Sequence, residues 1–196
     1  MDKNYIVKFA VESDLEGKMQ TQVSQELLKV LSYAVEEAMR TGDLSIGTDH
    51  LLLGLLRHRD NDACRALEAL GVDLADFKLS VESAIFRPDS IAFGHKDEVI
   101  FSRSARNTIN LCIVEASIAE SAKIIPVHLL LAISASASSA SLSYLKAVGL
   151  DHSRIRAYLK ENDLLKARIV KIKGSPEKNH PLNILTIMSS PDKICS

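Results

Sequence analysis

The chain has no tryptophan, and glycine, proline and cysteine are scarce, with eight, five and three residues among 196. It also lacks an excess of charge of either sign, because 24 Lys and Arg face 25 Asp and Glu. This balance excludes the basic surface that nucleic-acid-binding proteins and polybasic membrane anchors carry. The length suffices to bury a hydrophobic core, so the fold requires no disulfide or structural metal.

The cysteines favour reduced thiols. Cys64, Cys112 and Cys195 are odd in number, far apart and without a C-x-x-C pair, as is common in cytosolic proteins. The first residues show no basic region followed by an apolar stretch and a cleavage site, so we expect no secretion. The sequence therefore predicts a cytoplasmic protein in which Cys112 is a small buried residue.

The sequence contains an internal duplication. A shift of 78 positions carries Gly71 onto Gly149 and the run from His50 to Leu53 onto the run from His128 to Leu131. The matched positions keep glycine, aspartate and apolar residues, as a shared backbone requires. Further identities under this shift are Glu37-Ala38 with Glu115-Ala116, Ile46 with Ile124, Leu67 with Leu145 and Asp73 with Asp151.

Each repeat reads as four helices. Apolar residues recur at three- and four-residue steps in the first helix, and Gly42 supplies the left-handed residue that commonly follows a helix end. We expect the second helix to begin near Thr48, with its hydroxyl as the cap, and at Pro126 in the second repeat. Consecutive leucines over 51–56 leave no polar face, so this helix should be the buried centre of its repeat.

The third and fourth helices are separated by Gly-x-Asp. Gly71 and Gly149 end one helix, and Asp73 and Asp151 cap the next. The sequence thus predicts an all-α fold of two tandem four-helix repeats related by a pseudo-twofold. We place an N-terminal extension at 1–22, repeat 1 at 23–86, a linker at 87–100, repeat 2 at 101–162 and a C-terminal extension at 163–196.

The extensions hold three further features. The β-branched stretches at 5–11 and 168–173 read as short strands. The proline-containing tail includes an apolar segment at 182–188, which can dock on this domain or on a partner.

One stretch has the length of a membrane span. No Asp, Glu, Lys or Arg occurs between Ile124 and Leu145, although the stretch contains several serines. The shift places 135–141 on 57–63, which is a charged, solvated connection in the first repeat. We therefore expect a loop between two helices there.

Three spaced motifs carry a family resemblance: Val-Glu-Glu-Ala at 35–38, Gly-x-x-x-Ile-Gly-Thr-Asp-His-Leu-Leu-Leu-Gly-Leu-Leu at 42–56, and Leu-Gly-Val-Asp at 70–73. Over roughly 23–161 the chain resembles the double repeat of the Clp ATPase N-terminal domain. The resemblance implies a non-enzymatic, protein-binding module, which here lacks the AAA+ rings. The implied partners are Clp ATPase or protease components, adaptors and client proteins.

The resemblance also implies candidate site residues. Some relatives bind phosphoarginine once per repeat, through the Glu of Gly-Thr-Glu-His and a Thr at the start of the first helix, because a carboxylate matches a guanidinium. Carried over, the first site is Asp49 with Ser24. The second is Val127 with Ser102, and it is degenerate because valine cannot pair with a cation. The alternative for Asp49 is an acid favoured by the helix dipole.

Other chemistries lack their residues. The glycines at 42–48 have phosphate-loop spacing without its lysine, and no G-x-S-x-G turn follows a strand. His50 and His128 have no Cys or other His within four residues, so we expect each imidazole to bond the preceding turn rather than a metal. We predict no cofactor. Two alternatives remain: the excised N-domain of a longer Clp ATPase, and a small-molecule or metal-dependent enzyme in the cleft between the repeats.

Overall fold

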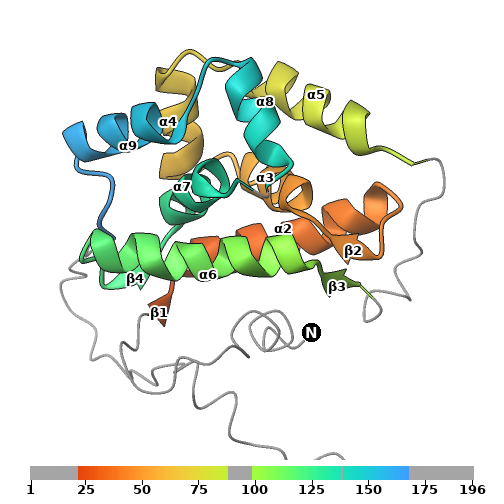
Figure 1. The fold of residues 1–196 in the computed structure, drawn as a ribbon, viewed down its shortest axis with the longest axis horizontal. Coiled ribbons are helices and arrows are strands. Elements are labelled where there is room, and N and C mark those ends of the chain that lie inside the picture. Colours follow the sequence, from red (N-terminus) through yellow and green to blue (C-terminus); the bar gives the residue numbers. More distant parts are fainter. Residues whose placement is uncertain (1–21, 88–98, 138, 168–196) are drawn as a thin grey trace, which may run out of the picture.

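The computed structural model describes residues 22–87, 99–137 and 139–167, and this part of the chain is mainly helical (Figure 1). Repeat 1 contains β1 (Gln22–Val23), α2 (Gln25–Arg40), β2 (Ser45–Ile46), α3 (Thr48–Arg57), α4 (Asp62–Ala69) and α5 (Leu74–Ile85). Repeat 2 contains β3 (Ile100–Phe101), α6 (Arg103–Ile118), β4 (Lys123–Ile124), α7 (Pro126–Ala135), α8 (Ser141–Ala147) and α9 (His152–Glu161). The strands predicted at 5–11 and 168–173 and the segment at 182–188 lie outside the described residues.

The helix bounds confirm the duplication. A shift of 78 places both ends of α2 on those of α6 and both ends of α3 on those of α7. The third and fourth helices also correspond: one end of each pair coincides under the shift, and the other differs by one or two residues. The predicted pair of four-helix repeats is therefore correct.

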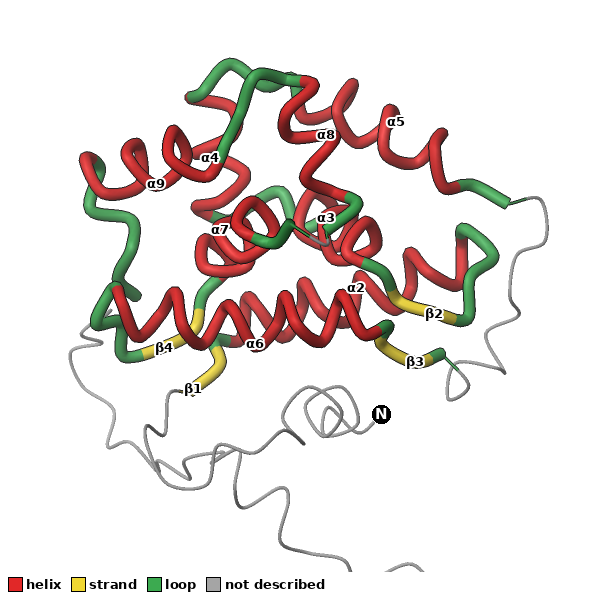
Figure 2. Tube along the Cα trace, in the orientation of Figure 1, coloured by secondary structure: helices red, strands yellow, loops and turns green. Residues whose placement is uncertain are grey.

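Short strands of two residues each join the repeats, and no sequence pattern indicated them. Strand β1 pairs in parallel with β4, and β2 pairs in parallel with β3 (Figure 2). The pairs are reciprocal: the Ser24 N–H donates to the Ile124 carbonyl at 2.9 Å, and the equivalent Ser102 N–H donates to the Ile46 carbonyl at 3.0 Å. In each repeat, the strand that precedes the first helix thus pairs with the strand that precedes the second helix of the other repeat, as a pseudo-twofold requires.

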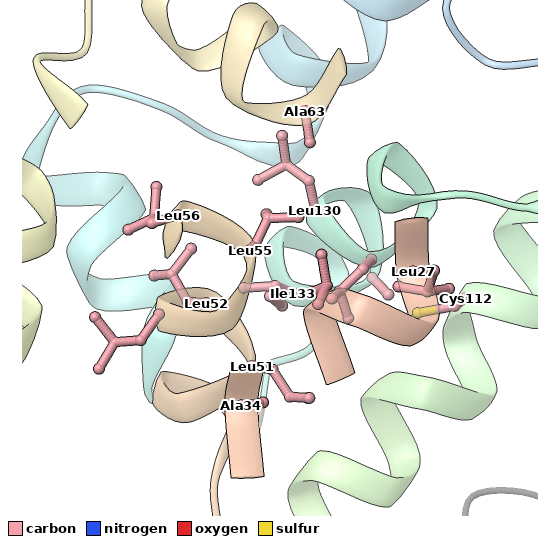
Figure 3. Close-up of a cluster of buried hydrophobic side chains, with 14 of the residues drawn as sticks. Leu27, Ala34, Leu51, Leu52, Leu55, Leu56, Ala63, Cys112, Leu130 and Ile133 are labelled. Atoms are coloured by element: carbon pink, nitrogen blue, oxygen red, sulfur yellow. The ribbon is translucent and has the colours of Figure 1, made fainter. Parts of the chain in front are cut away.

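Helices α3 and α7 form the centre of the molecule. From Leu51 to Leu56 every residue of α3 is buried, and so is every residue of α7 from Pro126 to Ser134. Leucines of α3 meet Leu130 and Ile133 of α7 in one cluster, with Cys112 at its edge (Figure 3). This confirms the predicted buried rods and the buried state of Cys112.

The uncharged stretch is not one continuous helix. Helix α7 ends at Ala135 and α8 begins at Ser141, so the serines between them connect two helices, as predicted. In the described ranges, no helix combines the length and the apolar character needed to cross a membrane.

The helix ends follow the predicted signals with one correction. Gly71 and Gly149 have positive φ, and Asp73 and Asp151 accept hydrogen bonds from the first turns of α5 and α9. Thr48, however, is the first residue of α3 and not its cap. The cap position belongs to Gly47, which has no side chain to accept from the first turn, and its own N–H donates to Nδ1 of His50 at 2.9 Å.

Helices α2 and α3 approach each other closely at Gly54. A Cβ added there would lie 2.5 Å from the Val30 carbonyl oxygen and 2.7 Å from the Ala34 nitrogen. Both are backbone atoms of α2, so a glycine is required for this crossing. The equivalent residue of α7 is Ala132, which is fully buried.

Candidate protein-binding site

The strand pairing determines which predicted site residues meet. Ser24 follows β1 and lies beside Ile124, at the start of α7. Asp49 lies in the first turn of α3, which follows β2 and is paired with β3. Ser24 and Asp49 therefore belong to different strand pairs, which flank opposite ends of α2 and α6 in Figure 1. Any site of this kind draws on both repeats: Ser102 lies beside the strand that leads to Asp49, and Ser24 beside the strand that leads to Val127.

Asp49 already has a partner from the other repeat. Its Oδ1 accepts a hydrogen bond from the Ser141 hydroxyl of α8 at 2.9 Å. Burial raises the pKa of the Asp49 carboxyl, and the bond from Ser141 opposes that shift. Burial also raises the pKa of Tyr144, with the nearby charge of Asp49 as the second cause. Asp49 thus joins the two repeats through α8.

The other three candidate site residues have structural roles. The hydroxyls of Ser24 and Ser102 accept from the N–H groups of Leu27 and Ala105, each at 3.1 Å, and so cap α2 and α6. Val127 is 0% exposed and lies in the buried rod α7. It has neither the charge nor the access to receive a guanidinium.

The two central histidines are held as neutral imidazoles. Nδ1 of His50 and Nδ1 of His128 accept from the backbone N–H of Gly47 and Ile125, at 2.9 and 3.1 Å. The proton therefore resides on Nε2, which donates to the Thr41 hydroxyl in repeat 1 and to the Leu165 carbonyl in repeat 2, both at 2.9 Å. Burial lowers the pKa of both histidines. These contacts make each ring a clamp on its preceding turn.

A serine and a histidine lie together at a position that sequence reasoning missed. The Ser134 hydroxyl is 3.1 Å from Nδ1 of His152. However, Nε2 of His152 accepts from Nε of Arg156 at 3.2 Å, so Nδ1 carries the proton and cannot act as a base toward serine. The Ser134 hydroxyl donates to the Leu131 carbonyl at 2.8 Å. The Arg156 guanidinium also pairs with the buried carboxylate of Glu115, so these side chains form a structural network.

Metal-binding groups do not assemble in the described part of the chain. Across residues 22–87, 99–137 and 139–167, no three His, Cys, Asp or Glu side chains converge on one point. Burial raises the pKa of the Cys64 thiol to about 11, and that of Cys112 further, so neither thiol ionises readily.

Three exposed apolar residues lie on chain segments that meet at the β2–β3 end of the seam between the repeats. Leu44, Phe86 and Ile100, here called the seam patch, are 46, 59 and 55% exposed. The Ile100 N–H donates to the Leu44 carbonyl at 2.9 Å, so a residue of each repeat contributes. Phe86 is brought to this end by Arg87, whose N–H donates to the Thr41 carbonyl at 3.0 Å and whose side chain pairs with Asp43 at 3.6 Å.

Among the described residues, the positions that correspond to the seam patch at the opposite end carry no exposed large apolar side chain. Under the shift of 78, Leu44 corresponds to the small residue Ala122, Ile100 to Gln22 and Phe86 to Leu164. Leu164 packs against the hydrophobic core instead of facing solvent. The patch was missed because adjacent surface residues far apart in sequence carry no periodic signal. A comparison of the two repeats at these positions would have shown the asymmetry.

The fold and seam define a tandem helical repeat domain whose exposed features suit binding to a protein. The chain matches the family described as the Clp repeat (R) N-terminal domain over residues 7–68 and 22–148. It belongs to this family, which confirms the resemblance drawn from the sequence.

Relatives agree with this assignment. A Bacillus subtilis (strain 168) protein, negative regulator of genetic competence ClpC/MecB, is 39% identical over 88 residues, which is 45% of this chain and 10% of that protein. The rice chloroplastic chaperone protein ClpC2 is 30% identical over 133 residues, which is 68% of this chain and 14% of the relative. The chain thus spans about a tenth to a seventh of these proteins, and the rice relative belongs to the chloroplast.

Solved structures share the fold. The N-terminal domain of ClpD from Arabidopsis thaliana superposes with a TM-score of 0.57 and 16% identity, over 74% of this chain and 99% of that one. The Hsp104 N-terminal domain from Candida albicans gives a TM-score of 0.60 and 15% identity, over 73% and 93% of the two chains.

Proposed function

We propose that this chain is a non-enzymatic binding module of the Clp chaperone and protease system. Its task is to receive client or adaptor proteins, or to dock on a Clp ATPase or protease complex. Membership of the Clp N-terminal repeat family supports the proposal, because that domain is a non-catalytic binding domain of Clp ATPases. The same role serves a chain that acts alone and one that precedes ATPase rings.

The seam patch is the main structural support for this proposal. Three large apolar side chains, about half exposed, lie where the two repeats meet, and charged groups of Asp43 and Arg87 flank them. An apolar centre with a polar rim is typical of a surface that binds protein. The patch replaces the binding site predicted from Ser24 and Asp49 as our principal candidate, within a domain that we place at residues 23–162.

A binding measurement with a matched variant tests this. The double substitution L44A/I100Q gives the seam patch the residues that the opposite end carries, Ala122 and Gln22. Fluorescence anisotropy would measure the affinity for a labelled, permanently unfolded client and for a purified Clp ATPase–protease complex. Interface anchors commonly contribute more than 1 kcal/mol each, so we expect the variant to bind about tenfold or more weakly.

The control is L79A. Leu79 is exposed on α5, and its counterpart in repeat 2 is Ala157, so the substitution removes a similar apolar area elsewhere. We expect L79A to bind like the wild type. Failure of the wild type to bind either partner would refute the proposed function. Equal binding by L44A/I100Q would refute the location of the site and leave the function standing.

A further inference from the structure

Helix α6 carries an apolar stripe that the described residues leave partly exposed. Val114 and Ile118 are 49 and 61% exposed, and Leu111 is half-buried on the same side of the helix, at steps of three and four residues. We call Leu111, Val114 and Ile118 the α6 stripe. It is separate from the seam patch, which lies at the other end of α6, around β2 and β3.

The first repeat shows that the fold does not require apolar residues here. The residues of α2 that correspond to Val114 and Ile118 are Glu36 and Arg40. Glu36 pairs with Arg57 at 2.8 Å, and Arg40 pairs with Glu82 at 2.7 Å and with Glu37 at 2.6 Å. A charged, paired surface in one repeat has thus been replaced by an apolar one in the other.

The end of the described chain lies beside this stripe. The Ala167 N–H donates to the Ser121 hydroxyl at 3.1 Å, and Lys166 pairs with Glu120 at 3.5 Å. Both acceptors follow α6 directly, two and three residues after Ile118. The polypeptide therefore leaves the bundle at the C-terminal end of α6.

The sequence that follows contains a fitting occupant. The segment from Leu182 to Met188 has five apolar residues among seven and no charge. The 14 residues between Ala167 and Leu182 have a root-mean-square span of about 20 Å and a maximum of about 50 Å. The α6 helix, with 16 residues, is about 24 Å long, so its whole length is within reach.

We propose that the segment 182–188 docks on the α6 stripe of its own chain. The tether keeps the segment at a high effective concentration, so a few apolar contacts suffice for occupancy. The docked segment covers Val114 and Ile118 and fixes the direction in which the chain continues. This inference concerns a different surface from the seam patch and does not depend on the proposed function.

Cys195 allows a direct test. Cys64 and Cys112 are buried, and burial raises their thiol pKa values, so a thiol-specific spin label attaches selectively to Cys195, seven residues after Met188. In the isotopically labelled full chain, we expect the label to broaden the amide resonances of the α6 stripe. In a mixture of spin-labelled unenriched chain with unlabelled enriched chain, we expect no broadening there.

The matched variant is V114E/I118R, which gives α6 the residues of α2. We expect it to abolish the broadening. If that variant fails to fold, I184D/I187D alters the segment alone and is expected to have the same effect. Absence of broadening at the stripe in the wild type, broadening of the same size in the mixture, which indicates docking on a second copy, or broadening that survives the substitutions would each overturn the proposal.

Discussion

Replacing Gly54 by alanine tests the close crossing of α2 and α3, because helix propensity and steric contact predict changes in stability of opposite sign. Within a helix, alanine is more favourable than glycine by about 1 kcal/mol. The new methyl group, however, would lie 2.5 and 2.7 Å from backbone atoms of α2, which cannot rotate away as a side chain can. Forcing an extra carbon into a packed interior costs about 1–3 kcal/mol, and backbone contacts place this site at the upper end.

We therefore expect Gly54→Ala to lower the free energy of unfolding by about 1–2 kcal/mol. Urea unfolding followed by circular dichroism would show a lower midpoint with an unchanged slope. The matched control is Ala132→Gly in α7, which creates no close contact and should cost about 1 kcal/mol through helix propensity. A Gly54→Ala protein as stable as the wild type, or more stable, would refute the close crossing of α2 and α3.

Three further predictions concern polar groups that the fold buries fully or in part. The buried Thr108 hydroxyl has no hydrogen-bond partner among the described residues, and the corresponding residue of repeat 1 is Val30. Urea titration of Thr108→Val should therefore show a free energy of unfolding about 1 kcal/mol higher than that of the wild type, and a loss of stability would contradict this. His50 and His128 have lowered pKa values in the fold, so the unfolded chain binds more protons below pH 6.5 and the free energy of unfolding should fall as the pH is lowered from there. Denaturation at pH 7.5 and 5.5 should show this loss, and the double variant His50→Asn/His128→Asn should reduce it. An unchanged pH dependence in the variant would exclude the two imidazoles as its source. Titration calorimetry with phosphoarginine should show weak or no binding, because Asp49 is held by Ser141; tight binding that Asp49→Ala abolishes would prove this wrong.

The two four-helix repeats could be predicted from the sequence because the signals for their helices are local and occur in both repeats. Gly71 and Asp73 mark a helix end and a helix start within three residues, and both recur 78 positions later. The leucines of α3 admit no exposed face, so they had to be central. These features depend on backbone geometry that neighbouring residues determine.

The contacts between the repeats could not be predicted in the same way. Strands of two residues carry no periodicity, so nothing in the sequence indicated that β1 would pair with β4. The sequence therefore groups Ser24 with Asp49 of its own repeat, although the strand pairing places Ser24 beside Ile124, in the strand that leads to Val127. Thr48 is a reasonable cap by residue type, yet Gly47 occupies the cap position and no side chain accepts from the first turn there.

The proposed function and its location depend on binding of a protein partner at the seam patch. The most direct test is a titration of the isotopically labelled chain with an unfolded client or a Clp ATPase, followed by amide and methyl chemical shifts. We predict that the largest changes cluster on Leu44, Phe86 and Ile100 and are small at the opposite end, around Ala122 and Leu164. Changes centred at that opposite end, or no saturable change with either partner, would contradict the claim.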